Sequence, residues 1–164
     1  KTVVAHSGTD SISDWGNNLV YGLFGKKGYQ YTSRYKEAEE VQKKALRKYG
    51  AQNLSTLSHS QSGLISELLG QKGLTGREAI SLNKATRIGS NVKMPNQYDI
   101  RSTADIVSNL NPFQSKSKND VIIPKQSYNP LTEHSPDILD RLDPEMMIGQ
   151  GLKLRKRRSK NTKV

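Results

Sequence analysis

Apolar and polar residues follow one another in a pattern that predicts alternating strands and helices. Residues 33–49 are predicted to form the clearest helix, because apolar positions recur every three or four residues and Gly50 offers a C-terminal stop. Residues 2–5 predict a buried strand, and residues 54–58 predict another, with a helix following as far as Gly70. The apolar positions of the first helix are Tyr35, Ala38, Val41, Ala45, Leu46 and Tyr49.

Shorter segments continue the alternation toward the C-terminus. Further strands are predicted at residues 79–83, 98–101 and 120–124, and short helices at residues 14–25, 103–110 and 135–142. Strands that alternate with helices favour an α/β fold with a mostly parallel sheet flanked by helices. The pattern ends near residue 145, so we predict one compact domain over residues 1–145 and a flexible tail over residues 146–164.

Composition restricts the class of protein. The 164 residues suffice for one domain with a sizeable core. Only 33% are hydrophobic and the mean hydropathy is −0.74, which predicts an economical core and a polar surface. No stretch approaches the roughly 20 apolar residues of a membrane span, and no signal-peptide pattern opens the chain. Lys1 stands where a methionine would begin a new chain, which suggests a processed product or part of a longer one. The lack of cysteine excludes disulfides and thiolate metal sites.

Positive charge is concentrated at the C-terminus. The net charge is +11, and seven of these charges lie in the last twelve residues without one acid among them. They are Lys153, Arg155, Lys156, Arg157, Arg158, Lys160 and Lys163. Such a run is often a solvated, disordered end, but it also suits contact with anionic lipid or nucleic acid, or a nuclear-localisation signal. No aromatic residues interleave the charges, so we do not expect sequence-specific recognition of nucleic acid.

The stretch "LSHSQSG" lies where the second strand meets its helix. It places Ser60 in the turn, with Ser58 and Ser62 two positions away on either side. In α/β-hydrolases the nucleophile occupies a strained strand–turn–helix bend that tolerates only small residues at those flanking positions. Ser60 is therefore a candidate nucleophile, and the alternative interpretation is a serine-rich helix cap.

A nucleophilic serine needs a base and an orienting carboxylate. Of the three histidines, only His134 follows Ser60 in the order serine, acid, histidine that α/β-hydrolases show. Between them, Asp99 lies inside the predicted strand 98–101, whereas Asp105 lies just past its end. Active sites of parallel sheets form at the carboxyl ends of the strands, so Asp105 is the favoured acid.

Four motifs over residues 2 to about 140 resemble the class 3 lipases, the fungal triacylglycerol lipase type of α/β-hydrolase. They are "VVAHSGTDSISDW", "LSHSQSG", "DIVSNL" and "EHSPDIL", in the order in which that family shows Arg-Gly-Thr/Ser with Asp-Trp, Gly-His-Ser-Leu-Gly-Gly, Asp-x-Val and a late histidine. The resemblance implies that Ser60, Asp105 and His134 are nucleophile, acid and base. It also implies that Thr9 and the backbone N–H of Gln61 form the oxyanion hole.

The chain departs from that family in several places. Ser7 stands where the family has arginine, serines replace two elbow glycines, and Gln61 replaces leucine. The region of the family's lid helix, near residues 10–24, is short and mostly polar here, which weakens the case for activation at a lipid–water interface.

The resemblance implies hydrolysis of carboxylic esters, with lipid or phospholipid esters as the expected substrates, through an acyl-enzyme intermediate. It requires no cofactor and no metal. The rival hypothesis is an inactive lipase-fold binding or structural protein whose basic tail holds nucleic acid, membrane or a partner protein. A chain rich in Lys and Asn and without cysteine also suits a viral or phage source, so we weigh a virion-associated protein alongside a soluble or peripheral one.

Overall fold

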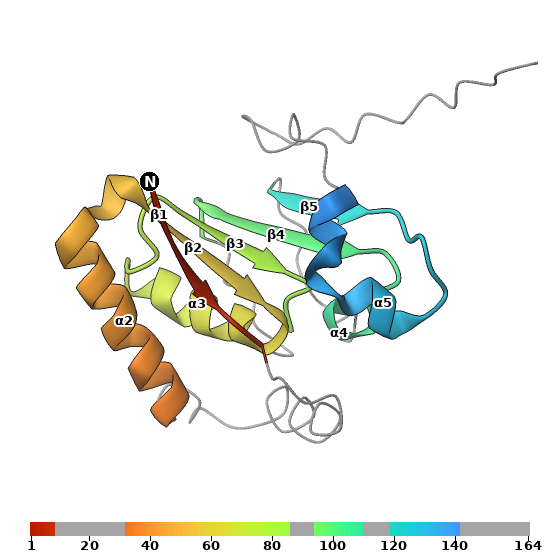
Figure 1. Ribbon diagram of the computed structural model, residues 1–164, viewed down its shortest axis with the longest axis horizontal. Helices are drawn as coiled ribbons and strands as arrows, with labels where there is room; N and C mark the ends of the chain where they lie inside the picture. The colour runs from red at the N-terminus through yellow and green to blue at the C-terminus, as the bar shows by residue number, and fades with distance from the viewer. Residues whose placement is uncertain (9–31, 86–93, 110–118, 142–164) are drawn as a thin grey trace, which may run out of the picture.

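The computed structural model describes residues 1–8, 32–85, 94–109 and 119–141. The described residues form a five-stranded, all-parallel sheet flanked by helices, in which the strands lie side by side in chain order (Figure 1). The strands are β1 (Thr2–His6), β2 (Leu54–His59), β3 (Glu78–Leu82), β4 (Gln97–Ser102) and β5 (Asp120–Ile123). The predicted α/β fold with a parallel sheet is therefore confirmed.

The helices are α2 (Ser33–Tyr49), α3 (Gly63–Gln71), α4 (Ile106–Asn109) and α5 (Pro130–His134), with single 3₁₀ segments η2 (Ala51–Asn53), η3 (Ser60–Ser62) and η4 (Pro136–Arg141). Helices α2, α3 and α4 lie between consecutive strands, and α5 follows β5. Helix α2 has the predicted bounds, and Gly50 ends it at φ 76°, a conformation that glycine adopts without strain. The sequence pattern did not predict α5. The predicted helix at residues 14–25, the lid region and the tail lie outside the described residues.

The buried face of helix α2 differs from the predicted apolar face. Tyr35 is buried as expected, but Val41 is 51% exposed and Tyr49 is 39% exposed. Gln42 is fully buried instead, and its Nε2 donates to Thr56 Oγ1 over 2.7 Å. A polar side chain is accommodated there because the strand beneath it presents a hydroxyl group rather than a methyl surface.

Strand β1 is less buried than the sequence predicted. The opening apolar run predicted a buried strand, yet Val3 is 60% exposed and none of the five residues is fully buried. The reason is position, because β1 is the edge strand of the described sheet and pairs only with β2 among the described strands.

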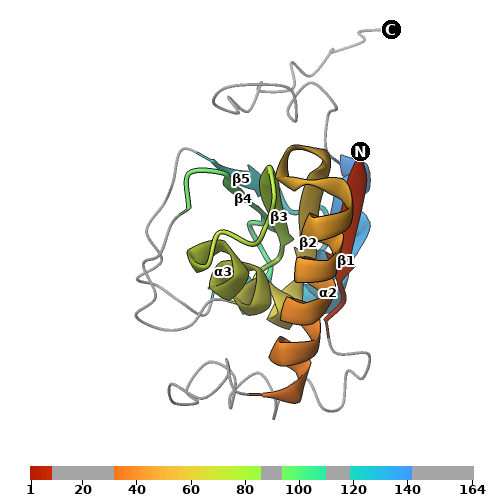
Figure 2. The ribbon, with the colours of Figure 1, turned by 90° about the vertical axis from the view of Figure 1, so that its left-hand side faces the viewer.

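The two faces of the sheet differ in polarity. One face carries an apolar cluster under η4, whereas α2 and α3 lie on the other (Figure 2). The apolar cluster consists of Leu82, Ile100, Val121, Ile123 and Ile138. On the face toward α3, Ser58, Ser81 and Asp99 form one row in register across β2, β3 and β4, and all three are buried. This polar layer explains how a chain with few hydrophobic residues fills its interior.

Because all five strands are parallel, their carboxyl ends meet at one edge of the sheet. The turn after β2 and the segment after β4 both begin there, and α4 lies beside α5 at the same edge (Figure 1). Three candidate residues far apart in sequence are thereby gathered in one place. No helix among the described residues is both long enough and apolar enough to cross a bilayer.

Candidate active site

Ser60 occupies a strained turn directly after β2. Its φ is 56°, the 3₁₀ turn η3 begins at this residue, and α3 follows from Gly63. A residue other than glycine seldom adopts a positive φ. The conformation costs of order 1–3 kcal/mol and persists only where the surrounding structure enforces it. The strand–turn–helix context that the sequence predicted for Ser60 is therefore present.

The serines on either side of Ser60 are tied to neighbouring strands. Ser58 Oγ lies 3.0 Å from Ser81 Oγ on β3. Ser62 Oγ lies 2.6 Å from the backbone oxygen of His6 and 2.7 Å from that of His59. Glycine at these positions would fit the bend but would make none of these hydrogen bonds. The serines that depart from the lipase motif thus link β2 to β3, through Ser58, and the turn to β1, through Ser62.

Two glycines allow close packing around the turn. A Cβ on Gly63 would lie 2.1 Å from Cγ of Lys84, and a Cβ on Gly8 would lie 3.2 Å from Cβ of Ser60. Lys84 has little room to move, because it is 3% exposed and its Nζ lies 2.8 Å from Asp99 Oδ2. In addition, the backbone N–H of Ala85 donates to the Ser60 carbonyl over 3.0 Å. The segment after β3 therefore supports the turn from behind.

Ser60, His134 and Asp105 form a continuous chain of hydrogen bonds. Ser60 Oγ lies 2.8 Å from Nε2 of His134, and Nδ1 of the same ring lies 2.6 Å from Asp105 Oδ1. An ionised carboxylate only accepts, so the ring proton sits on Nδ1 and leaves Nε2 to accept the serine O–H. This is the geometry in which an imidazole removes a proton from serine.

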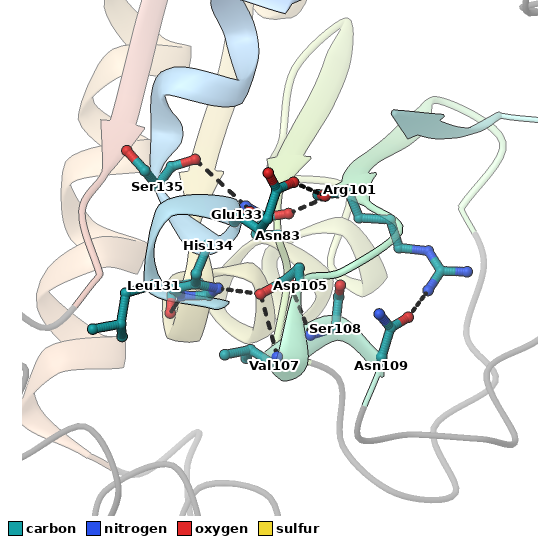
Figure 3. A network of polar contacts seen from close by, with 12 residues as sticks. Asn83, Arg101, Asp105, Val107, Ser108, Asn109, Leu131, Glu133, His134 and Ser135 are labelled. Carbon is teal, nitrogen blue, oxygen red and sulfur yellow. Dashed lines mark hydrogen bonds and ion pairs between the residues drawn. The ribbon is translucent and has the colours of Figure 1, made fainter. Parts of the chain in front are cut away.

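Asp105 is held rigidly for this contact. It is completely buried, and Oδ1 also accepts from the backbone N–H of Val107 over 3.2 Å (Figure 3). Its Oδ2 accepts from the backbone N–H of Ser108 over 2.9 Å. Asp99, the alternative acid, lies within β4 and pairs with Lys84 instead. The structure brings Asp105 to the histidine and leaves Asp99 elsewhere.

Glu133, next to His134, anchors the segment that carries the histidine. Its buried carboxylate accepts from the Ser102 hydroxyl, from Arg141 Nη1 over 2.9 Å, and from the backbone N–H groups of Gln126 and Ser127 over 3.0 and 2.7 Å. Burial alone would raise the pKa of Glu133, but these donors outweigh it and hold the pKa at about 2. Glu133 is therefore an ionised structural anchor rather than a proton donor.

Asn83 links the same segment to the sheet (Figure 3). Its Nδ2 donates to the Glu133 carbonyl over 2.9 Å, and its Oδ1 accepts from the Ser102 N–H over 3.1 Å. Asn83 has φ 42°, a conformation that asparagine tolerates better than most residues. Sequence reasoning missed both Asn83 and Glu133, although an asparagine directly after a strand is a usable signal for such a turn.

His59 contacts the backbone of the candidate base rather than Ser60. Its Nε2 donates to the His134 carbonyl over 2.8 Å, and the two rings lie 5.1 Å apart between centroids. Burial lowers the pKa of His59, with the hydrogen bond to His134 acting in the opposite direction. The neutral ring carries its proton on Nε2 to make this bond.

Of the two residues expected to form an oxyanion hole, the structure describes only Gln61. Thr9 lies outside the described residues, while its neighbour Gly8 packs against Ser60. Gln61 is the second residue of η3 and directly follows Ser60, as the sequence motif requires. Among the described residues, no group of three or more His, Asp or Glu side chains is arranged to bind a metal ion.

Comparison with known proteins adds no family to this geometry. No protein-family model matches the chain, and no curated protein is significantly similar to it in sequence.

Proposed function

We propose that this protein is a serine hydrolase that cleaves carboxylic esters through an acyl-enzyme intermediate. The observation that carries the proposal is the hydrogen-bonded series Ser60, His134 and Asp105, with the serine on a turn at φ 56°. A serine-rich helix cap has no need of a buried histidine and carboxylate aligned behind one of its hydroxyls.

In the proposed acylation step, Ser60 Oγ attacks the ester carbonyl carbon while its proton passes to Nε2 of His134. Asp105 keeps the ring in the required tautomer and stabilises the imidazolium. The carbonyl oxygen becomes negative and accepts a hydrogen bond from the Gln61 backbone N–H, one of the donors assigned to the oxyanion hole. The carbon–oxygen bond to the alcohol then breaks, and Nε2 returns its proton to the departing oxygen.

Deacylation repeats the cycle with water. His134 removes a proton from a water molecule as the water oxygen attacks the acyl carbon, and the bond to Ser60 Oγ breaks as Nε2 returns the proton to the serine. The products are a carboxylic acid and the alcohol released earlier. Removing one oxyanion donor typically costs about 3 kcal/mol of transition-state stabilisation.

We further propose the class 3 lipase type of α/β-hydrolase, with a lipid or phospholipid ester as substrate. The order of the four sequence motifs supports this assignment, and so does the position of Ser60 after β2 of a parallel sheet. In this proposal the basic tail attracts the protein to an anionic membrane surface.

Turnover of a soluble p-nitrophenyl ester tests the proposal. Ser60→Ala should abolish hydrolysis, whereas Ser55→Ala, on the same strand but bonded to Glu78, should retain it. Both variants should keep the far-UV circular dichroism of the unaltered protein. Equal turnover by the unaltered protein and Ser60→Ala would contradict the triad assignment. A folded protein without turnover would favour the rival binding or structural role.

A further inference from the structure

Arg34, near the start of α2, contacts the two segments that flank the candidate nucleophile. Its Nη2 donates to the backbone oxygens of Ser7 and Gly8, over 2.6 and 3.0 Å. Its Nη1 donates to Oε1 of Gln61 over 3.3 Å. One guanidinium therefore joins the loop after β1 to the residue that follows Ser60.

Planarity of the peptide bond gives these contacts a directional effect. The C=O of Ser7 and the N–H of Gly8 belong to one peptide group and point in opposite directions. Holding the carbonyl toward Arg34 therefore turns the Gly8 N–H away from Arg34. Gly8 itself lies against Ser60, since a Cβ added there would be 3.2 Å from the Ser60 Cβ.

We propose that Arg34 is a positioning residue for the oxyanion hole. This inference rests on the proposed ester hydrolysis. Arg34 holds the loop after β1 through the carbonyls of Ser7 and Gly8, and it holds Gln61 through the side chain of Gln61. The backbone N–H groups of Gly8 and Gln61 therefore keep a constant orientation. Preorganised donors stabilise a developing oxyanion because they need no rearrangement during the reaction.

The chemistry of the contacts favours arginine at this position. The guanidinium is planar, always charged, and presents several N–H donors in a rigid fork, which allows three acceptors to be held at once. A lysine ammonium is a compact charge on a flexible stem and does not reproduce this geometry. Arg34→Lys should therefore retain only part of the positioning that the Arg34 guanidinium provides.

Kinetics of Arg34→Ala test the inference, with Arg47→Ala as the matched control. Arg47 lies in the last turn of the same helix and is exposed, so the control removes an equal charge at a distance from the site. We expect Arg34→Ala to lower kcat roughly tenfold to hundredfold, less than loss of a donor itself, with KM little changed. Methylguanidinium added below denaturing concentrations should recover part of the kcat of Arg34→Ala alone.

Amide hydrogen exchange gives a second readout that does not depend on activity. Exchange of residues 6–8 and 60–62 should be faster in Arg34→Ala than in Arg47→Ala, with the rest of the sheet unchanged. Equal kcat in the two variants, or equal exchange at these segments, would overturn the inference. If the unaltered protein hydrolyses no ester, the proposed function fails, and the exchange comparison still decides whether Arg34 holds the loop.

Discussion

Replacing each of two buried aspartates by asparagine should separate catalysis from stability. Asp105 lies 2.6 Å from the His134 ring, whereas Asp99 lies in β4 and pairs with Lys84 at 2.8 Å. Both side chains are buried, so the two substitutions remove the same charge from similarly shielded surroundings. We expect Asp105→Asn to impair mainly kcat and Asp99→Asn to impair mainly folding stability.

The expected loss in Asp105→Asn follows from its hydrogen bonds. If the NH₂ of the new amide faces His134, the ring adopts the opposite tautomer and Nε2 no longer accepts the Ser60 proton. If the amide oxygen faces His134 instead, the amide NH₂ opposes the Ser108 N–H that Asp105 Oδ2 now accepts. In the first case kcat should fall about 10⁴-fold, as for the corresponding serine-protease change, which corresponds to about 5 kcal/mol.

Asp99→Asn removes the nearest anion from a buried lysine. Breaking a buried ion pair costs about 3–5 kcal/mol, and we expect the lower end because Glu67 remains 3.9 Å from Lys84. Urea denaturation and p-nitrophenyl ester kinetics on both variants, under conditions where each is folded, measure the two effects. A greater loss of kcat in Asp99→Asn than in Asp105→Asn would refute the assignment of the acid.

Three further changes have defined outcomes. Gly63→Ala should destabilise the fold by about 1–3 kcal/mol in urea denaturation, because its Cβ would lie 2.1 Å from Lys84 Cγ. Gly73→Ala is the comparison variant: its Cβ would meet no neighbour, but φ is 69°, so it measures backbone strain without a steric clash. Burial lowers the pKa of both His6 and His59 below 6.5, so unfolding free energy should fall as pH drops through this value, and a pH-independent free energy between pH 7 and 5 would contradict that burial effect. Deleting residues 153–164 should weaken binding to anionic vesicles without changing turnover of a soluble ester. Binding is measured at low salt, because exposed charges are screened beyond about 8 Å at physiological ionic strength. Equal vesicle binding by both forms would refute the membrane role.

Local signals in the sequence were sufficient for much of the fold. Helix α2 begins and ends where its periodicity and Gly50 predicted, and the strands lie within two residues of their predicted bounds. Parallel pairing followed from the alternation of strands and helices. These features depend on residues close together in the chain, which is why a single sequence carries them.

Burial depended on contacts that the sequence does not display. Val3 belongs to an apolar run, but its strand lies at the edge of the described sheet and leaves it exposed. Gln42 interrupts the apolar pattern of α2, yet it is buried because Thr56 on β2 provides a partner. In both cases the identity of the neighbouring element decides the outcome, and that identity is a property of the tertiary structure.

The candidate site divides in the same way. Ser60 was found from its small neighbours, His134 from its order along the chain, and Asp105 from its place just past a predicted strand. The structure brings all three together. The supporting residues Glu133 and Asn83 were not found, because each acts through partners on separate elements. Arg34 provides a guanidinium beside Ser7, where the lipase motif would have placed an arginine.

Covalent labelling of Ser60 by a fluorophosphonate tests the central claim most directly. The reagent reacts with a serine whose proton is removed by a neighbouring base, and peptide mass spectrometry locates the adduct. The account predicts one adduct, on Ser60, with labelling lost in Ser60→Ala and strongly slowed in His134→Ala. No adduct on the folded protein, or an adduct on a different serine that persists in Ser60→Ala, would contradict it.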